Sequence, residues 1–241
     1  MSVVTERVEG FPLPPLTPPT PGRVDVWLMD VAGLPMMVTP PERENGAASP
    51  LAHAARDLRI RQQFFLRLLF GRYLNKPGKD IRFSKTPDGK PFLLNENLEI
   101  NITHTRGWLA VAVAGHGPIG IDIEIDRIIG RAGAMARRCY APQEASAIEA
   151  LDEPERSRAF LQRWIRTEAL VKAQGARLAT SLSHLEFDHP SLCLQTTPAD
   201  WPSPEQWTIE PLPMPTPLIG AVASPEAIEG ICLHRVVTDH S

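Results

Sequence analysis

The sequence predicts an α+β fold, because segments with the two-residue period of strands occur together with segments that have the helical period. The same order, a strand, a long helix and further strands, is expected on both sides of about residue 117. The 241 residues, 43% of them hydrophobic, suffice for one large domain or for two closely packed halves. We find no clear internal sequence repeat.

The first half is expected to begin with a proline-rich segment. Phe11 to Gly22 contains six prolines, so residues 1–22 are predicted to form a flexible, extended N-terminal tail. A strand is predicted at Val24 to Met29, and Pro40 to Pro50 reads as a loop. Apolar residues at helical spacing then predict a long amphipathic helix from about Ala52 to Leu74.

A turn and two strands complete this half. Pro87-Asp88-Gly89-Lys90 has the chemistry of a turn, and together with Lys85 it places two lysines and several backbone N–H groups on one loop. Such a loop could bind a phosphate, or it could be a plain hairpin turn with solvated lysines. Strands are predicted at Glu99 to Thr103 and at Trp108 to Ala114, and His104 between them could equally be a structural histidine.

The second half is expected to begin with an acidic strand. Alternation along Ile119 to Asp126 places four isoleucines on one face and Asp122, Glu124 and Asp126 on the other. Neighbouring carboxylates repel one another, and a hard cation with oxygen ligands, such as Mg²⁺, relieves the repulsion. The alternative is a solvated polar face.

Helices and short strands follow. Arg131 to Ala150 reads as helical with a break at Ala141-Pro142, and a later helix carries Glu168 and Lys172 on one face before ending at Gly175. The Glu168–Lys172 pair could be no more than a surface ion pair. Short strands separated by proline-rich turns are predicted at Leu185 to Phe187, Leu192 to Gln195, Trp207 to Glu210, Leu218 to Ala223 and Ile231 to Val237.

Composition excludes several classes of protein. A net charge of -3 argues against a protein that mainly binds nucleic acid. The three cysteines are too few and too scattered for a disulfide framework, and no apolar run is long enough to span a membrane. The N-terminus lacks the pattern of a signal peptide. We therefore expect a cytoplasmic protein that does not bind membranes, and we expect it to be a monomer.

Four motifs, in order, resemble the 4'-phosphopantetheinyl transferases of the Sfp (surfactin-synthetase-activating) type. They are Phe83-Ser84…Gly89-Lys90-Pro91, Asn101-Ile102-Thr103-His104, Gly120-Ile121-Asp122-Ile123-Glu124 and Trp164…Glu168-Ala169…Lys172…Gly175. The segment from Arg137 to Glu144 also resembles a basic and aromatic stretch of that family. The resemblance runs from about Arg56 to Phe187. Each motif alone is weak, and their order and spacing make the set specific.

The resemblance implies two similar α+β halves related by a pseudo-twofold axis, at residues 23–117 and 118–241, with the ligand cleft between them and the metal site in the second. It implies transfer of the 4'-phosphopantetheine arm of coenzyme A to a serine of an acyl or peptidyl carrier protein, with release of adenosine 3',5'-bisphosphate. Mg²⁺, or Mn²⁺, would be held by Asp122, Glu124 and Glu168, and Glu168 would also accept the serine proton. Lys172 would contact the phosphates from the same helix.

The resemblance also implies a coenzyme A site in the first half. Its predicted members are Lys85, Gly89 and Lys90 of the turn, Thr103 and His104 at the strand end, and Arg56 of the long helix, which would meet the 3'-phosphate.

Two positions depart from the family pattern. Thr167 stands where Lys usually precedes the helix Glu, and Arg166 lies one place earlier, which is a rotation of about a hundred degrees around the helix. Thr103 replaces a common Ser and keeps the hydroxyl. Since no predicted metal ligand is lost, we expect an active enzyme. The alternatives are another metal-dependent phosphoryl enzyme, such as a phosphodiesterase, and a coenzyme A-binding module without turnover.

Overall fold

The computed structural model describes residues 1–9, 13–32 and 50–237, and it is a mixed α+β fold, as predicted. Its largest sheet has the order β1-β12-β2-β6-β5, in which β12 pairs parallel with β1 and with β2 and the other pairs are antiparallel. These strands are β1 (Ser2–Glu9), β12 (Gly230–Val237), β2 (Arg23–Asp30), β6 (Trp108–Ala114) and β5 (Glu99–Thr105). The predicted loop at Pro40 to Pro50 lies almost wholly outside the described residues.

A second, antiparallel sheet has the order β10-β11-β7. Its strands are β10 (Thr208–Leu212), β11 (Leu218–Ser224) and β7 (Gly120–Ile125). Two short hairpins pair β3 (Phe83–Lys85) with β4 (Pro91–Leu93), and β8 (Glu186–Phe187) with β9 (Leu194–Thr196). The helices are α1 (Pro50–Leu74), α2 (Ala132–Cys139), α3 (Pro142–Glu149), α4 (Glu155–Gln174) and α5 (Leu178–Ser181), with short 3₁₀ turns at Gly78–Asp80, Leu182–His184 and Pro204–Gln206.

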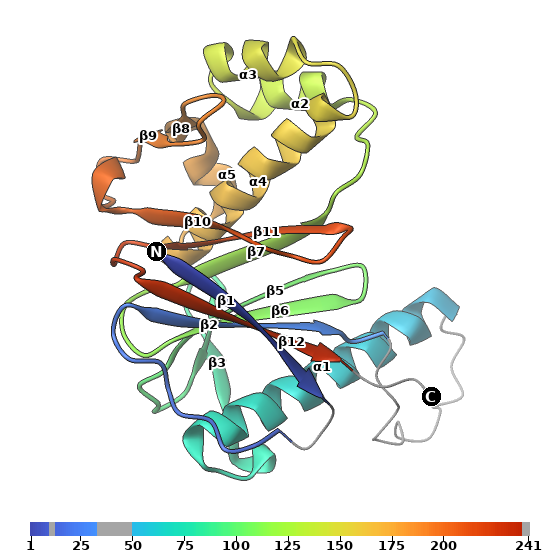
Figure 1. The fold of residues 1–241 in the computed structure, drawn as a ribbon, viewed down its shortest axis with the longest axis vertical. Helices are drawn as coiled ribbons and strands as arrows, with labels where there is room; N and C mark the ends of the chain where they lie inside the picture. Colours follow the sequence, from blue (N-terminus) through green and yellow to red (C-terminus); the bar gives the residue numbers. More distant parts are fainter. Residues whose placement is uncertain (10–12, 33–49, 238–241) are drawn as a thin grey trace.

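The two sheets and two long helices form four layers (Figure 1). On one side, Phe65 and Leu69 of α1 pack on Trp27 of the large sheet. The isoleucines of β7 pack with alanines of β6 between the two sheets, and on the other side α4 covers the small sheet. The predicted division of β7 into an isoleucine face and an acidic face is therefore confirmed, since Ile119, Ile121 and Ile123 are buried between the sheets.

Local signals correctly predicted most elements. The break at Ala141-Pro142 separates α2 from α3, and Gly175 ends α4 with the positive φ of 73° that a left-handed C-terminal residue requires. The Pro87-to-Lys90 turn joins β3 to β4, with Gly89 at a φ of 92°. Within the described part of the chain, no helix is long and apolar enough to cross a membrane.

The chain ends differ from the predicted organisation. Ser2–Glu9 is a strand, because its backbone pairs along the whole of β12, and Leu13 of the proline-rich segment is buried in the core beneath α1. Residues 10–12 of that segment lie outside the described residues. Strand β12, from the end of the predicted second half, is an inner strand of the sheet built mainly from the first half.

Candidate active site

The acidic strand β7 lies directly beneath α4, and Gly120 allows this close approach. A Cβ atom at residue 120 would lie 1.9 Å from the carbonyl oxygen of Ala169 and 2.5 Å from the nitrogen of Ala173, both in α4. Only glycine leaves room for the helix backbone at that point. The contact fixes α4 over β7 so that Lys172 of the helix reaches Asp122, two residues further along the strand.

Asp122 is the centre of this cluster. Its Oδ1 accepts hydrogen bonds from the Thr103 hydroxyl at 2.8 Å and from Lys172 Nζ at 2.7 Å, and only 9% of its side chain is exposed. Lys172 Nζ also lies 3.3 Å from Thr103 Oγ1 and 4.0 Å from Glu168 Oε2. Burial raises the pKa of Asp122, against the opposing effects of Lys172 and Thr103. The cluster therefore joins β5, β7 and α4.

The other two predicted metal ligands flank Asp122. Glu124 Oε2 accepts hydrogen bonds from the backbone N–H of Ile125 at 3.0 Å and from Arg127 at 3.0 Å. Glu168 is half-buried, and burial raises the pKa of its carboxyl; Lys172 opposes this, while the charges of Asp122 and Glu124 add to it. The three carboxylates thus influence one another electrostatically.

These acids are neighbours without forming a tight cluster. Among the described residues, the one group of three or more His, Cys, Asp or Glu side chains with ligand atoms all within 4.8 Å of one another is Glu6, Cys232 and His234. Asp122, Glu124 and Glu168 are therefore not gathered at that spacing, and Lys172 is the cation that neutralises Asp122.

Asn101, which was not among the predicted ligands, links β5 and β7, each of which lies at the edge of its sheet. Asn101 of β5 is buried, and its Oδ1 accepts a 2.9 Å hydrogen bond from the backbone N–H of Ile121 in β7. Thr103 and Thr105, two and four residues along β5, bond to Asp122 and Glu124. Polar residues at the alternate positions 101, 103 and 105, with Ile100 and Ile102 on the opposite face, were the signal that could have identified this face.

The predicted phosphate turn contacts the end of α4. Lys90 Nζ donates to the carbonyl oxygens of Ile119 at 3.3 Å and Ala173 at 3.2 Å, and burial lowers the pKa of Lys90. Asp88 in the same turn pairs with Arg177 at 2.9 Å. The turn therefore connects the first half of the chain to the second half.

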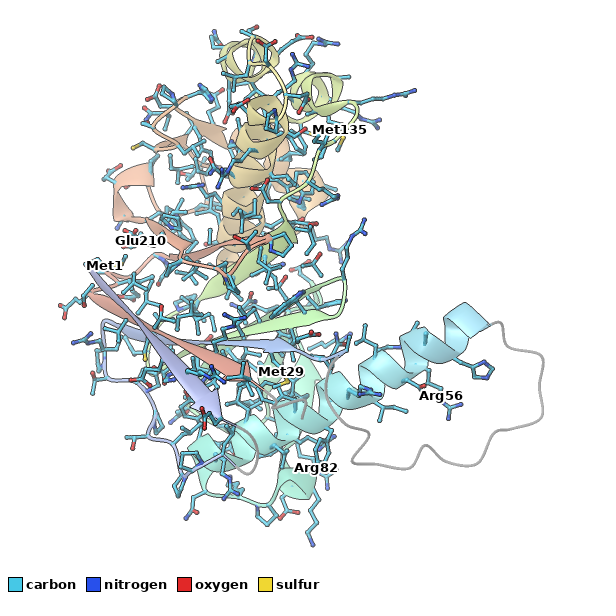
Figure 2. The ribbon with its side chains drawn as sticks, turned by 45° about the vertical axis from the view of Figure 1, so that its right-hand side comes forward. Met1, Met29, Arg56, Arg82, Met135 and Glu210 are labelled. Carbon is cyan, nitrogen blue, oxygen red and sulfur yellow. The ribbon has the colours of Figure 1, made fainter. Side chains whose placement is uncertain are left out.

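The remaining predicted ligand contacts are not gathered at Asp122. Lys85 and Gly89 are exposed on the β3–β4 hairpin. His104 is also exposed, and strand alternation points its side chain to the face opposite that of Thr103. Arg56 is exposed on the part of α1 that projects beyond the sheets (Figure 2). Their roles stay predictions.

Thr167, the departure from the family pattern, faces the interior. It is fully buried, and its hydroxyl accepts a hydrogen bond from Arg163, which is itself fully buried and paired with Glu144. The Arg163 guanidinium also donates to the Leu185 carbonyl at 2.9 Å and lies over the Phe187 ring at 4.0 Å. Residue 167 is therefore part of a buried ion-pair network and does not contact Asp122.

Comparisons with known proteins show what this chain is similar to. Residues 118–211, which contain β7 and α4, match the 4'-phosphopantetheinyl transferase superfamily. The chain is 27% identical over 162 residues to the 4'-phosphopantetheinyl transferase HetI of Nostoc, an alignment that covers 66% of each chain. It is 28% identical over 180 residues to the human L-aminoadipate-semialdehyde dehydrogenase-phosphopantetheinyl transferase, covering 70% of this chain and 56% of the relative.

A third relative is the 4'-phosphopantetheinyl transferase Sfp of Bacillus subtilis, which is 31% identical over 118 residues, or 48% of this chain and 51% of the relative. The chain thus spans between about half and two thirds of the length of these three relatives.

Proposed function

We propose that the chain transfers the phosphopantetheine arm of coenzyme A to a serine of an acyl or peptidyl carrier protein, because residues 118–211 match the 4'-phosphopantetheinyl transferase superfamily. The observation that carries the proposal is the contact of Asp122 with Thr103 and with Lys172, whose Nζ lies 4.0 Å from Glu168 Oε2. Through these contacts, the motifs that contain Thr103, Asp122 and Lys172, three of the four that resemble the family, lie together. In this reaction the serine oxygen would bond to the phosphorus of the phosphopantetheine phosphate. The bond from that phosphorus to the diphosphate bridge oxygen would break, and adenosine 3',5'-bisphosphate would leave with that oxygen.

The donor set fits a hard divalent cation. Asp122, Glu124 and Glu168 offer only oxygen ligands, and the raised pKa values of Asp122 and Glu168 reflect burial in a site with excess negative charge. We propose that these three acids hold Mg²⁺, with Mn²⁺ as the alternative ion. When bound, the ion would neutralise charge on the diphosphate of coenzyme A.

Glu168 is the proposed general base. A carboxylate with a raised pKa accepts a proton more readily near neutral pH than an ordinary glutamate does. Lys172, one helical turn away, would stabilise charge on the phosphates once it turns from Asp122 toward the ligand. Thr103 would orient Asp122 through its hydroxyl.

The coenzyme is proposed to lie between residues 23–117 and 118–241, two halves related by a pseudo-twofold axis. Lys85, Gly89 and Lys90 of the turn, together with Thr103 and His104, would contact its phosphates, and Arg56 would reach the 3'-phosphate. The link between the turn and the end of α4 supports a shared site. We also propose a cytoplasmic monomer whose partners are coenzyme A and the carrier protein.

The test is intact-mass analysis of a panel of apo carrier proteins incubated with coenzyme A and Mg²⁺. We expect a carrier heavier by the phosphopantetheine arm with the wild type and no mass gain with Asp122→Ala. Asp126→Ala is the matched control, because Asp126 follows the acidic face of the same strand but pairs with Arg158 at 3.4 Å, outside the Asp122 cluster. Transfer at the wild-type rate by Asp122→Ala would refute its metal role.

Two other outcomes identify the alternatives. Unchanged carriers with hydrolysed coenzyme A indicate a phosphodiesterase. Unchanged carriers with bound, intact coenzyme A indicate a binding module.

A further inference from the structure

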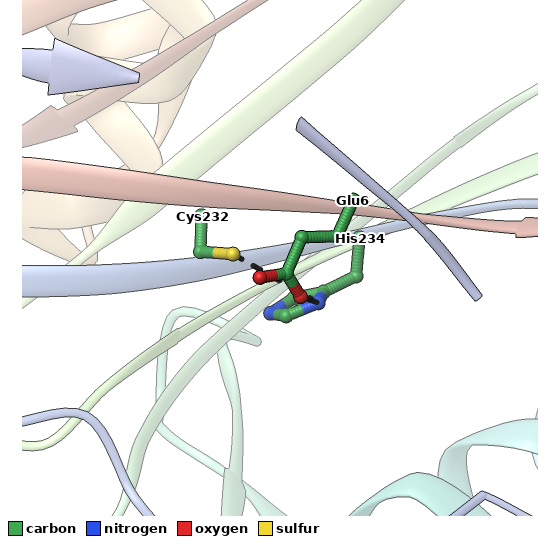
Figure 3. A group of neighbouring side chains, drawn as sticks. All are labelled: Glu6, Cys232 and His234. Carbon is green, nitrogen blue, oxygen red and sulfur yellow. Dashed lines mark hydrogen bonds and ion pairs between the residues drawn. The ribbon is translucent and has the colours of Figure 1, made fainter. Parts of the chain in front are cut away.

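A second cluster of chemically active side chains lies in the large sheet, away from Asp122. Glu6 of β1 and His234 of β12 are paired in register, and Cys232 lies two residues before His234. Because side chains alternate along strands, the three project from the same face of two neighbouring strands. Figure 3 shows them directed toward one another.

The spacing of the three groups suits one metal ion. His234 Nδ1 lies 3.2 Å from Glu6 Oε2 and 3.9 Å from Cys232 Sγ, and the three ligand atoms are all within 4.8 Å of one another. Tetrahedral Zn²⁺ with ordinary bonds to sulfur, nitrogen and oxygen separates its ligand atoms by about 3.3–3.6 Å. Small side-chain rotations would therefore complete the geometry.

The His234 ring is already held in the orientation that a ligand needs. It stacks on Trp27 with ring centroids 4.2 Å apart and planes 17° apart, and its Nε2 lies 3.6 Å from Asp25 Oδ1. Asp25 in turn accepts a hydrogen bond from Tyr73. Metal-bound histidines commonly present their second nitrogen to a carboxylate in this way, which leaves Nδ1 for the ion.

The cluster can be reached from solvent. Glu6, Asp25 and Cys232 line a cavity of about 360 Å³ at the sheet surface, together with Thr17 and Thr20. The cavity leaves space for a water or another small ligand in a fourth coordination position.

We propose that Glu6, Cys232 and His234 form a binding site for a single borderline divalent cation of the Zn²⁺ type, with Asp25 as the carboxylate that orients His234. The donors are one sulfur, one nitrogen and one oxygen, which favour Zn²⁺ over Mg²⁺ and so separate this site from the all-oxygen acids at Asp122. The ion would cross-link the edge strand β1 to β12.

A cysteine nucleophile is the competing explanation for the same groups. Burial and the charges of Glu6 and Asp25 raise the pKa of Cys232 to about 11, against the opposing charge of Arg23. That environment is the opposite of the one that activates a catalytic cysteine.

Titration with Co²⁺ tests the proposal, because a thiolate bound to Co²⁺ gives a strong charge-transfer absorption in the near ultraviolet and the carboxylates at Asp122 do not. We expect saturation by one equivalent in the wild type, no such absorption in Cys232→Ser, and binding weakened at least roughly tenfold in His234→Gln and Asp25→Asn. Cys193→Ser is the control, since Cys193 is an exposed free thiol and its loss should change nothing. No absorption in the wild type, or equal absorption in Cys232→Ser, would overturn the proposal.

A second measurement covers the case in which Cys232→Ser does not fold. In a chain that carries Cys139→Ser and Cys193→Ser, Cys232 is the remaining thiol, and Zn²⁺ should slow its alkylation by iodoacetamide. Equal alkylation rates with and without Zn²⁺ would also overturn the site. Neither result bears on phosphopantetheine transfer, which is assayed with Mg²⁺.

Discussion

Replacing Thr167 by the lysine that the family pattern leads one to expect should destabilise this protein. Thr167 is fully buried on α4, and its hydroxyl lies against the guanidinium of Arg163. Thr167→Lys would place a second cation beside a buried one, and the single carboxylate of Glu144 could not compensate both. The change therefore tests whether residue 167 belongs to the core or to the phosphate site.

The expected cost follows from the burial of this network. An uncompensated charge in a buried ion pair costs about 3–5 kcal/mol, and forcing a longer side chain into a packed core adds about 1–3 kcal/mol. The two costs together give a loss of at least about 4 kcal/mol, which lowers Tm by roughly 8–16 °C in a chain of this size. Thr167→Val keeps the shape and removes only the hydroxyl, so it should cost about 1–3 kcal/mol.

Thermal unfolding followed by circular dichroism, and the transfer rate measured below Tm, provide the assay. We expect Thr167→Lys to be less stable than Thr167→Val and no faster than the wild type. If Thr167→Lys keeps the wild-type Tm and raises the transfer rate, then residue 167 faces the phosphates and the buried arrangement is wrong.

Three further predictions concern the residues around β7. Gly120→Ala should push α4 away from β7, because the new Cβ would lie 1.9 Å from the Ala169 carbonyl oxygen. We expect the free energy of unfolding in denaturant to fall by at least about 1–3 kcal/mol and the transfer rate to fall roughly a hundredfold, and a variant as stable as the wild type would contradict this packing. Lys90→Met should lower the free energy of unfolding by about 1–3 kcal/mol, since two main-chain carbonyls lose their donor; a rise in KM for coenzyme A with no change in stability would assign Lys90 to ligand binding alone. Asp122→Asn should become more stable relative to the wild type as pH rises, because burial raises the pKa of Asp122 despite Lys172 and the wild-type fold loses stability when this carboxyl ionises. Urea unfolding between about pH 4 and 7 measures the difference, and parallel pH profiles of the two proteins would argue against the raised pKa.

The sequence predicted the features that depend on local chemistry. The isoleucine face of β7 follows from two-residue alternation, and the end of α4 follows from Gly175, whose positive φ is costly for other residues. The hairpin at Gly89 was equally local. The association of Asp122 with Lys172 came from the order of motifs, since no local rule brings a strand and a distant helix together.

The features that were missed depend on contacts between distant segments. Strand β1 was wrongly predicted to be part of a flexible tail, because the strand with which it pairs, β12, is at the other end of the chain. Lys90 was predicted to bind phosphate, with a solvated turn lysine as the alternative, and neither interpretation included the two main-chain carbonyls that it contacts once the turn packs against α4. Arg163 had no sequence signal for burial, because arginine is mostly exposed in proteins and only its partners Glu144 and Thr167 explain its position.

The location of the site follows from how the two sheets meet. Strands β5 and β7 are each at an edge, and they belong to different sheets, so no continuous backbone ladder joins them. An edge strand leaves backbone groups without partners, and here the Asn101 side chain satisfies the N–H of Ile121 in place of a strand. Because side chains bridge this gap, polar groups such as Thr103 can reach Asp122 through it. A backbone ladder at this point would have closed the space in which the acids of β7, the hydroxyls of β5 and Lys172 of α4 converge.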